Sequence, residues 1–598
     1  MPGVTTKAIS ACAAVLLSWG CGSSGGGGCN TAHDCDTTQR CVSGACAART
    51  GPGDLGESCT AGADCSPGLS CTGPDKGFAS GACTVACGAG CASGSACADL
   101  RGTTADARLC APSCAADRDC RNGEVCCGAQ GNVCLDGALC GPPVSPTTCT
   151  APTLVAGGTI VAIQPPAGTC SRPIQPSAAP AAQVQSFRTR RVGESISFNV
   201  PSGTGSVSIF EQATPAASTG KVYFTDGNSD DNSAVPRDLT APDGTTVFDD
   251  LRQPADPTTA QVFYAGGSPS TGTLTVPNTS ASLGSDFAAG GLKPGTWKLT
   301  VGDFAYECTQ VSNCADGGTT AGQYDVTVVT KPGLPTQGAL DLAFYIVGSA
   351  PFSAASAPSN AQAKRIVQTV SDIYAQAGIC VRNATFYDVP AWARTAYGTT
   401  IDADHTGPCD TLDQMFLLSQ PGKNTLNFFL VQSITSTSNC GGQVVGIDGT
   451  IPGPAGLGGT VHSGAAVSIA DLGNPRTQLC GSAVDVGNCA ADEVAYIAAH
   501  EGGHFLGLFH LTESSGESFD PLTDTPTCKC DSCVTASSQA SCGKGANPPL
   551  VGATDCAGTQ AACSGGQYLM FWQLNPQVSQ AQISPQQGQL MRLNLVVQ

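Results

Sequence analysis

The pattern of apolar and polar positions changes along the 598 residues of the chain. Residues 149–335 contain short runs of β-branched and aromatic residues, and several alternate apolar with polar positions, as in GTWKLTV from Gly295 to Val301. Period-two alternation between clusters of Gly, Pro, Asn and Asp predicts an all-β sandwich. Residues 336–598 instead combine nearly continuous apolar runs with helical periodicity, which predicts a mixed α and β domain.

Within this last domain the runs LDLAFYIV (340–347), TLNFFLV (425–431) and AAVSIA (465–470) predict buried strands. Apolar residues at helical spacing between Ala363 and Ala377 predict a helix that ends at Gly378. A second helix is predicted from Asp492 to Gly507, and Ser584-Pro585 begins a third near the end of the chain.

Residues 29–148 show no such periodicity and are dominated by cysteine. The chain has 35 cysteines, and eighteen of them lie between Cys29 and Cys140. A unit of Cys, five residues, Cys, five residues, Cys recurs, for example at Cys59, Cys65 and Cys71. Units this small need disulfides to fold, and the CxxC pairs of a zinc ribbon are missing from the repeats. The sequence therefore predicts disulfide-rich repeats in an oxidising compartment.

Residues 1–21 indicate export. Lys7 precedes an apolar run from Ala8 to Trp19, too short to cross a bilayer, and Cys21 follows Gly20. This end resembles the lipobox of bacterial lipoproteins, which implies a lipidated Cys21, a Gly/Ser tether at 22–28 and a place on the outer membrane or cell surface. Plain secretion is the alternative. Any membrane contact is expected through this lipid anchor only.

The net charge limits the classes of binding partner that we expect. The formal net charge is −19, from 46 acidic and 27 basic residues. Nucleic-acid partners need a basic face, so we expect no nucleic acid to bind.

The stretch HEGGHFLGLFH holds three of the six histidines of the chain. His500 and His504 are one helical turn apart and can reach a single ion, and Gly507 can turn the chain so that His510 becomes a third ligand. Three histidines and one open position are typical of a catalytic zinc site. Zinc acidifies a bound water, and Glu501 can take its proton as general base.

The motif HExxHxxGxxH resembles the signature of the metzincin metallopeptidases. That resemblance implies a methionine turn beneath the metal, for which Met570 in GQYLMFW is the candidate. GLFH followed by DPLTDTPTC (Asp520 to Cys528) is most similar to the pappalysin-type family. The resemblance further implies a two-part catalytic domain in which the strand near Val467-Ser468-Ile469 pairs with an extended substrate. Trp572 stands where many metzincins have a tyrosine, so help from a tyrosine hydroxyl is in doubt.

Two further metal sites are considered between His510 and Met570. Asp520 and Asp524 could bind calcium together with backbone carbonyls, or could be ordinary loop acids. Cys530 and Cys533 form a CxxC pair, for which disulfides are the favoured interpretation and a second metal the alternative.

These features predict an exported zinc endopeptidase that hydrolyses protein or peptide substrates outside the cytoplasm. The competing hypothesis is a surface binding or adhesion protein whose metallopeptidase domain is inactive or only processes itself.

Overall fold

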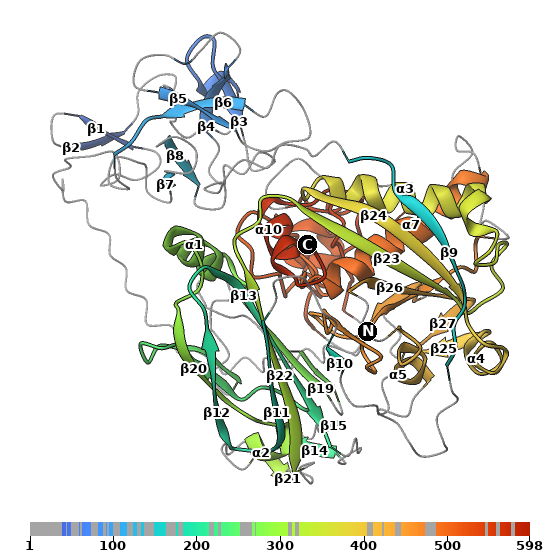
Figure 1. Cartoon of the computed structure of the whole chain (residues 1–598). Coiled ribbons are helices and arrows are strands. Elements are labelled where there is room, and N and C mark those ends of the chain that lie inside the picture. The colour runs from blue at the N-terminus through green and yellow to red at the C-terminus, as the bar shows by residue number, and fades with distance from the viewer. Residues whose placement is uncertain are drawn as a thin grey trace. The chain divides into compact units, whose positions relative to one another are not determined.

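A computed structural model gives the fold of the chain (Figure 1). The residues that it describes are 39–42, 45–48, 55, 59, 62–72, 82–87, 91, 95–99, 108–115, 124–127, 133–136, 149–162, 175–176, 183–214, 221–224, 229–231, 233–250, 266–268, 271–308, 314–316, 322–403, 411–420, 424–436, 444–472, 486–544, 548–557, 563–575 and 580–598. The predicted signal, Cys21 and the tether lie outside these residues. The chain divides into two compact units near residue 146.

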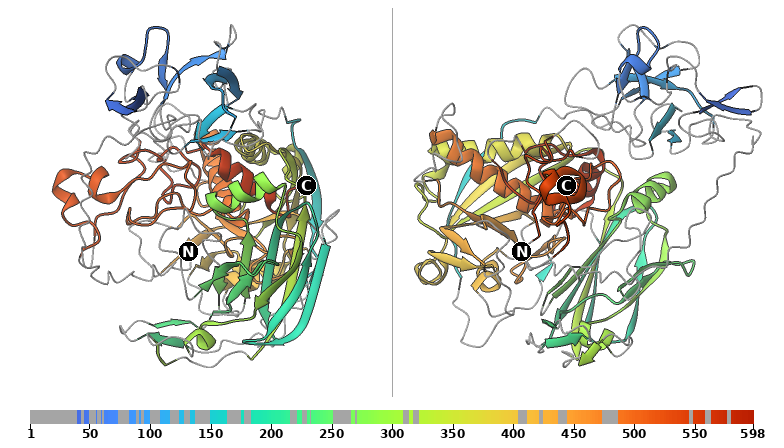
Figure 2. Two further views of the ribbon diagram at one scale, coloured as in Figure 1. Left: turned by 90° about the vertical axis from the view of Figure 1, so that its left-hand side faces the viewer. Right: turned by 180° about the vertical axis from the view of Figure 1, so that it is seen from behind.

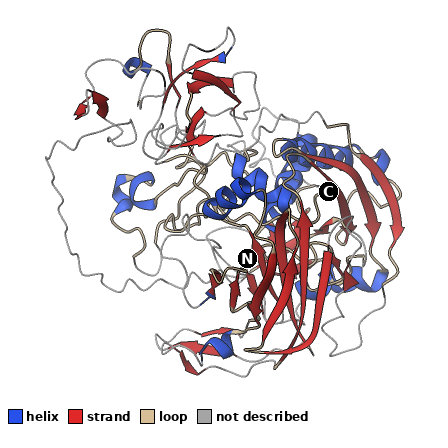
Figure 3. Cartoon of the chain, turned by 60° about the vertical axis from the view of Figure 1, so that its left-hand side comes forward, coloured by secondary structure: helices blue, strands red, loops and turns tan. Residues whose placement is uncertain are grey.

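Strands make up most of the regular structure, and helices are few (Figure 3). The chain is thus a multidomain, disulfide-rich protein that is mostly β, as the sequence predicts. None of the helices in the described ranges has the length and apolar character needed to cross a bilayer.

The first unit holds the cysteine repeats in short antiparallel strands. Its four-stranded sheet has the order β3 (Ser70–Thr72), β4 (Ala82–Ala86), β6 (Arg108–Pro112), β5 (Ser95–Asp99). Two hairpins accompany it, β1 (Gln39–Val42) with β2 (Ala45–Ala48) and β7 (Glu124–Cys127) with β8 (Val133–Asp136).

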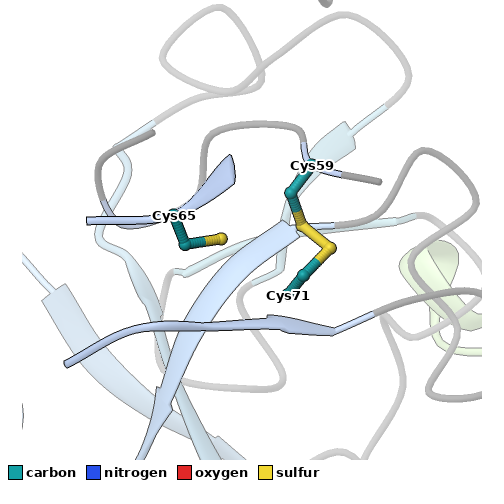
Figure 4. Close-up of side chains that lie close together, drawn as sticks. All are labelled: Cys59, Cys65 and Cys71. Atoms are coloured by element: carbon teal, nitrogen blue, oxygen red, sulfur yellow. A yellow bond between two sulfur atoms is a disulfide. The ribbon is translucent and has the colours of Figure 1, made fainter. Parts of the chain in front are cut away.

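Disulfides replace a large core in this unit. In the repeat of Cys59, Cys65 and Cys71, the first and third cysteines pair, and the middle one pairs with Cys83. The three sulfurs lie close together (Figure 4), but they belong to two disulfides and are not metal ligands. Two more bonds, Cys87–Cys97 and Cys91–Cys110, follow along the chain. The predicted disulfides are confirmed for these repeats.

In the second unit, two antiparallel sheets form a β-sandwich. The larger has the order β11 (Gln183–Arg191), β22 (Gln323–Pro332), β13 (Thr204–Ala213), β19 (Thr271–Val276), β18 (Gly266–Ser268). The smaller has the order β12 (Ser195–Val200), β20 (Gly295–Thr300), β16 (Asp238–Thr240), β17 (Thr246–Asp249). Alternate residues such as Ile209, Val328 and Leu299 meet between the sheets in one apolar core.

The sandwich also carries two helices, α1 (Ser280–Ala289) and α2 (Phe304–Cys308). A small sheet of β15 (Ser229–Asp231), β14 (Lys221–Phe224) and β21 (Cys314–Asp316) completes it.

The other half of the second unit is built on a six-stranded sheet. Its order is β28 (Gly446–Asp448), β30 (Ala465–Ser468), β26 (Leu426–Val431), β23 (Gly338–Ile346), β24 (Ile379–Asp388), β9 (Thr153–Thr159). All neighbours are parallel except the edge strand β28, which runs antiparallel to β30.

Helices cover both faces of this sheet (Figure 1). The helices α3 (Ala361–Ala375), α7 (Val486–Phe505) and α10 (Pro585–Leu593) share one core with strand residues such as Phe344 and Phe428. On the opposite face, α4 (Ala391–Tyr397) and α5 (Thr411–Phe416) pack against Tyr345 and Phe429. The smaller elements are β25 (Thr400–Asp402) with β27 (Ser433–Thr435), β10 (Gln175–Pro176) with β29 (Leu457–Gly458), α8 (Cys530–Cys533) and α9 (Ala536–Gln539).

The predicted boundary at residue 149 is wrong for β9. That boundary places the segment TLVAGGT in the sandwich, but β9 pairs with β24 in the mixed sheet. The disulfide Cys149–Cys380 joins the starts of the two strands. The sequence of a short strand does not indicate which strand it pairs with, so its sheet becomes known only from the tertiary structure.

The sandwich and the mixed domain share buried contacts. Phe210 on β13 and Val329 on β22 lie in the core that contains Phe344. The Nζ of buried Lys331 donates to the carbonyl oxygens of Arg592, Asn594 and Val597 at 2.5, 2.8 and 2.5 Å. Figure 2 shows the C-terminal helix, in red, beside the green strands of the sandwich. The end of the chain is therefore held by the sandwich.

Candidate metal centre

The helix α7 carries the first part of the motif. It begins at Val486, six residues before the predicted start at Asp492, and ends at Phe505. Asp492 accepts hydrogen bonds from the Nε and Nη2 of Arg365 at 2.7 and 3.0 Å, which fix α7 against α3. His500, Glu501 and His504 follow in the last two turns. Glu501 and His504 are buried, and His500 is partly buried.

The two residues between Glu501 and His504 are both glycine because neither position has room for a side chain. A Cβ at Gly502 would collide with the Tyr374 hydroxyl and lie 2.9 Å from Leu426 Cδ2. A Cβ at Gly503 would lie 2.5 Å from the sulfur of Met570. The glycines thus allow close packing on both sides of the helix that holds the histidines.

The chain turns directly after the helix. Gly507 has a φ of 102°, a conformation that favours glycine, and its N–H donates to the His504 carbonyl at 2.8 Å. Three residues later, His510 returns to the helix. The Nε2 of His510 lies 3.2 Å from that of His500 and 3.1 Å from that of His504.

The opposite nitrogen of each ring has an acceptor. The Nδ1–H of His500 donates to the Leu569 carbonyl and that of His504 to the Leu508 carbonyl, both at 2.7 Å. The Nδ1 of His510 lies 3.1 Å from both carboxylate oxygens of Glu513. With the protons on Nδ1, three Nε2 lone pairs converge on one point.

This donor set fits zinc. Tetrahedral coordination with Zn–N bonds of about 2.0–2.1 Å places ligand nitrogens about 3.3 Å apart. The observed separations of 3.1 and 3.2 Å are close to that value. Converging lone pairs repel one another unless a cation or a proton lies between them.

Burial keeps His500 and His504 neutral. Desolvation, with the nearby His510, lowers the pKa of His500 to about 3. Burial and the other two histidines lower the pKa of His504 well below its usual value. A metal ion therefore does not compete with protons for the rings of His500 and His504 near neutral pH.

Glu513 was not predicted from the sequence. Burial acts to raise its pKa, but the electrostatic interaction and the hydrogen bond with His510 outweigh burial and leave the pKa below its usual value. Its carboxylate orients His510, as outer partners of metal ligands commonly do. An acid three residues after the third histidine was the available signal.

Glu501 lies against the edge strand β28. A Cβ at Gly446 would overlap its carboxylate, so the glycine makes room for it. Burial and the nearby Asp448 raise the pKa of Glu501 well above its usual value, while the Asp448 backbone N–H acts in the opposite direction. Ligand atoms of Asp448, Glu501 and His504 lie within 4.8 Å of one another. Asp448 is a second residue that the sequence analysis missed.

Met570 is fully buried beneath the helix, in contact with Gly503. Its carbonyl accepts the N–H of Leu511 at 3.1 Å, and the preceding carbonyl, of Leu569, accepts from His500. The segment therefore supports both ends of the histidine motif. Two residues on, the Nε1 of Trp572 donates to the Val551 carbonyl at 2.7 Å, and Tyr568 forms a bridge with Gln582.

Asp520 and Asp524 have structural partners. The carboxylate of Asp524 accepts from Ser584 Oγ and Gln586 N, both at 2.8 Å, at the start of α10. Asp520 accepts from Thr525 Oγ1 at 2.6 Å. Among the described residues, neither belongs to a group of three side chains placed to share a cation.

Three disulfides fasten the segment between His510 and Met570. They are Cys528–Cys556, Cys530–Cys542 and Cys533–Cys563. Both cysteines of the CxxC pair are thus oxidised, which rules out the second metal considered there. Of the remaining histidines, His33 and His405 lie outside the described residues. His462 is buried, and its Nδ1 lies 4.0 Å from the Oδ1 of Asp413.

The expectation that β30 pairs with substrate is wrong. Val467 on β30 pairs with Leu430 on one side and with Gly446 on the other, so both of its edges are occupied. The edge strand is β28, which the continuous apolar pattern did not reveal because it is only three residues long.

The sequence matches no family model and no curated protein.

Proposed function

We propose that the chain is a zinc-dependent endopeptidase with His500, His504 and His510 as metal ligands and Glu501 as general base. The observation that carries the proposal is the convergence of three Nε2 atoms while every Nδ1 is hydrogen-bonded. When bound, zinc supplies a Lewis acid that acidifies water and polarises a carbonyl group.

Glu501 is suited to move the proton. Burial and Asp448 raise its pKa from the usual value toward the working pH. A general base is most effective when its pKa lies near that pH. It would take a proton from water and pass it to the leaving amine. The missing side chain at Gly446 leaves room for this carboxylate against β28.

The substrate would lie along β28. An extended peptide can add to a free sheet edge through main-chain hydrogen bonds. The side of β28 opposite β30 is the edge nearest to Glu501. Protein or peptide substrates in extended form are therefore the expected class.

The mixed domain has the features that a metzincin-like peptidase of pappalysin type would need. They are an antiparallel edge strand beside Glu501, a helix that ends at the Gly507 turn, and a buried methionine below the ligands. Trp572 stands where many metzincins have a tyrosine, and its side chain has no oxygen. The proposed mechanism therefore includes no tyrosine hydroxyl at this position.

The proposed location is outside the cytoplasm. The disulfides indicate an extracellular or otherwise oxidising environment. Attachment through a lipid on Cys21 is part of the proposal, with plain secretion as its alternative. Palmitate labelling of the wild-type chain and of Cys21→Ala separates the two.

Cleavage of an unfolded protein by the wild type and by Glu501→Gln tests the activity. We expect the variant to retain zinc and to lose activity by about 10²–10⁴-fold. Glu517→Gln, an exposed change in the following loop, is the control. Zinc without cleavage in the wild type would favour the binding or adhesion hypothesis.

A further inference from the structure

The helix α7 ends beside its metal ligands, and its last carbonyl groups need partners from beyond the helix. The His504 carbonyl accepts from the Gly507 N–H, as described above. The Gly503 carbonyl accepts from the Leu508 N–H at 3.0 Å, which completes the usual pattern of a helix that ends at a glycine. The Phe505 carbonyl, directly after His504 in sequence, accepts from two segments that are distant along the chain.

The two donors to the Phe505 carbonyl come from different sides of the mixed domain. The Gly453 N–H donates at 3.0 Å and lies in the loop that follows the edge strand β28. The side-chain Nδ2 of Asn594 also donates at 3.0 Å, from the residue directly after the helix α10. This carbonyl therefore joins the metal-binding helix to the loop after β28 and to the C-terminal segment.

Asn594 is buried and held through its other polar groups as well. Its Oδ1 accepts from the Val596 N–H at 3.0 Å, so the side-chain amide has a donor and an acceptor partner that fix its orientation. Its backbone N–H donates to the Met591 carbonyl at 3.2 Å. Its carbonyl accepts from the Nζ of Lys331 at 2.8 Å. The donor that faces Phe505 is thus fixed in place.

The sandwich binds both segments that reach the end of α7. Besides the lysine bond, the Oγ of buried Ser206 on β13 donates to the Leu593 carbonyl at 2.7 Å, one residue before Asn594. In the loop after β28, the Oγ1 of Thr450 lies 3.3 Å from the Oγ1 of Thr273 on β19. The position of the Phe505 carbonyl therefore depends on the sandwich through two separate contacts.

A metal centre is sensitive to this position. Ligand distances must lie within about 0.2 Å of the ideal values for zinc to bind well. His504 directly precedes Phe505, and the turn that begins after Phe505 leads to His510. A buried carbonyl that loses a donor is costly, so the end of the helix would shift toward another partner. Such a shift moves His504 and His510 relative to each other.

We propose that Asn594 is a positioning residue of the metal centre and that the sandwich, by holding Asn594, is a working part of the catalytic unit. The inference rests on the proposed zinc site. It gives the sandwich a role that is separate from substrate binding: the sandwich holds the end of α7 where three histidines can share one ion.

Asn594→Leu tests this role in the full, oxidised chain, because leucine keeps the size of the side chain and removes its donor. Asn424→Leu is the matched control, since the Nδ2 of Asn424 donates to the Leu595 carbonyl of the same segment at 3.1 Å. Zinc affinity is measured by competition with a chelating dye, and kcat and KM on an unfolded protein. For Asn594→Leu we expect about 10-fold weaker zinc binding and a lower kcat, with KM within about twofold of the wild type. The control should bind zinc like the wild type.

A milder pair of variants keeps the test decisive if Asn594→Leu does not fold. Ser206→Ala removes one hydrogen bond between the sandwich and the C-terminal segment. Ser208→Ala removes a similar one inside the sandwich, where the Ser208 Oγ lies 3.1 Å from the Oγ1 of Thr275. We expect zinc affinity to fall about two- to fivefold in Ser206→Ala and to stay unchanged in Ser208→Ala.

The outcomes separate this inference from the proposed function. Unchanged zinc affinity in Asn594→Leu, or equal losses in Asn594→Leu and Asn424→Leu, would overturn the positioning role, because the segment would then act through stability alone. A wild type that binds zinc but cleaves nothing would refute the peptidase, while the differences in zinc affinity would still support the positioning role. A folded wild type that binds no zinc would overturn both.

Discussion

The Nδ1 of His500 lies 2.7 Å from the carbonyl oxygen of Leu569, 69 residues further along the chain. This hydrogen bond fixes the tautomer that presents Nε2 to a metal. It also joins the helix α7 to the segment of Met570, so the ligands and the floor beneath them form one packed unit.

Glu513→Gln tests the support of His510. The amide still accepts a hydrogen bond but loses the charge, so we expect zinc affinity to fall about 10–100-fold. Competition with a chelating dye measures the affinity. Glu517→Gln should bind zinc like the wild type, and an unchanged affinity in Glu513→Gln would show that His510 needs no carboxylate.

Gly502→Ala tests the packing behind the motif. The added methyl group meets the Tyr374 hydroxyl and Leu426, which are rigidly held, so we expect a loss of about 1–3 kcal/mol in the free energy of unfolding. Urea denaturation measures it. Gly62→Ala, where no atom lies within 4 Å, is the control. Equal losses in both variants would contradict the packing argument.

Gly503 and Met570 should be energetically coupled. A methyl group at Gly503 meets the Met570 sulfur at 2.5 Å, so Gly503→Ala should cost less when Met570→Ala has already removed that sulfur. A double-mutant cycle on the free energy of unfolding measures the coupling. Strictly additive costs would mean that the methionine does not support the helix at this point.

Lys331→Met tests whether the sandwich stabilises the mixed domain. Methionine keeps the apolar stem but leaves three buried carbonyl oxygens without their donor, so we expect a loss of about 2–4 kcal/mol. Thermal unfolding and cleavage activity are the measurements. Lys293→Met, at an exposed ion pair with Asp243, should have little effect. Unchanged stability of Lys331→Met would mean that the contact is dispensable.

The metal-free chain should be sensitive to acid. His500 has a pKa of about 3 in the folded chain against 6.5 for an unperturbed ring, so the unfolded chain binds more protons between these values. The free energy of unfolding therefore falls as the pH falls from about 6.5 toward 3, and buried His504 acts in the same direction. Denaturation of chelated protein from pH 7.5 to 4 measures this. The slope should be smaller in His500→Gln, and an identical slope would contradict the assignment.

The sequence predicted the parts of the site that depend on short spacing. His500, His504, Gly507 and His510 lie within one helix and one turn, where helical geometry alone brings side chains together. Alternation likewise predicted strands such as β12 and β20, because each residue's face follows from its neighbours.

Features that depend on tertiary pairing were not predicted. Asp448 lies more than 50 residues before Glu501 and meets it only because β28 closes the edge of the sheet. The same reason explains the errors at β9 and β30, whose partners are distant in sequence.

X-ray absorption at the zinc edge, on the purified and oxidised chain, tests the central claim most directly. The account predicts about one zinc per chain with three nitrogen ligands at about 2.0–2.1 Å and one oxygen ligand. A folded chain that holds no zinc, or zinc with sulfur ligands at about 2.3 Å, would contradict the assignment of His500, His504 and His510 as the metal centre.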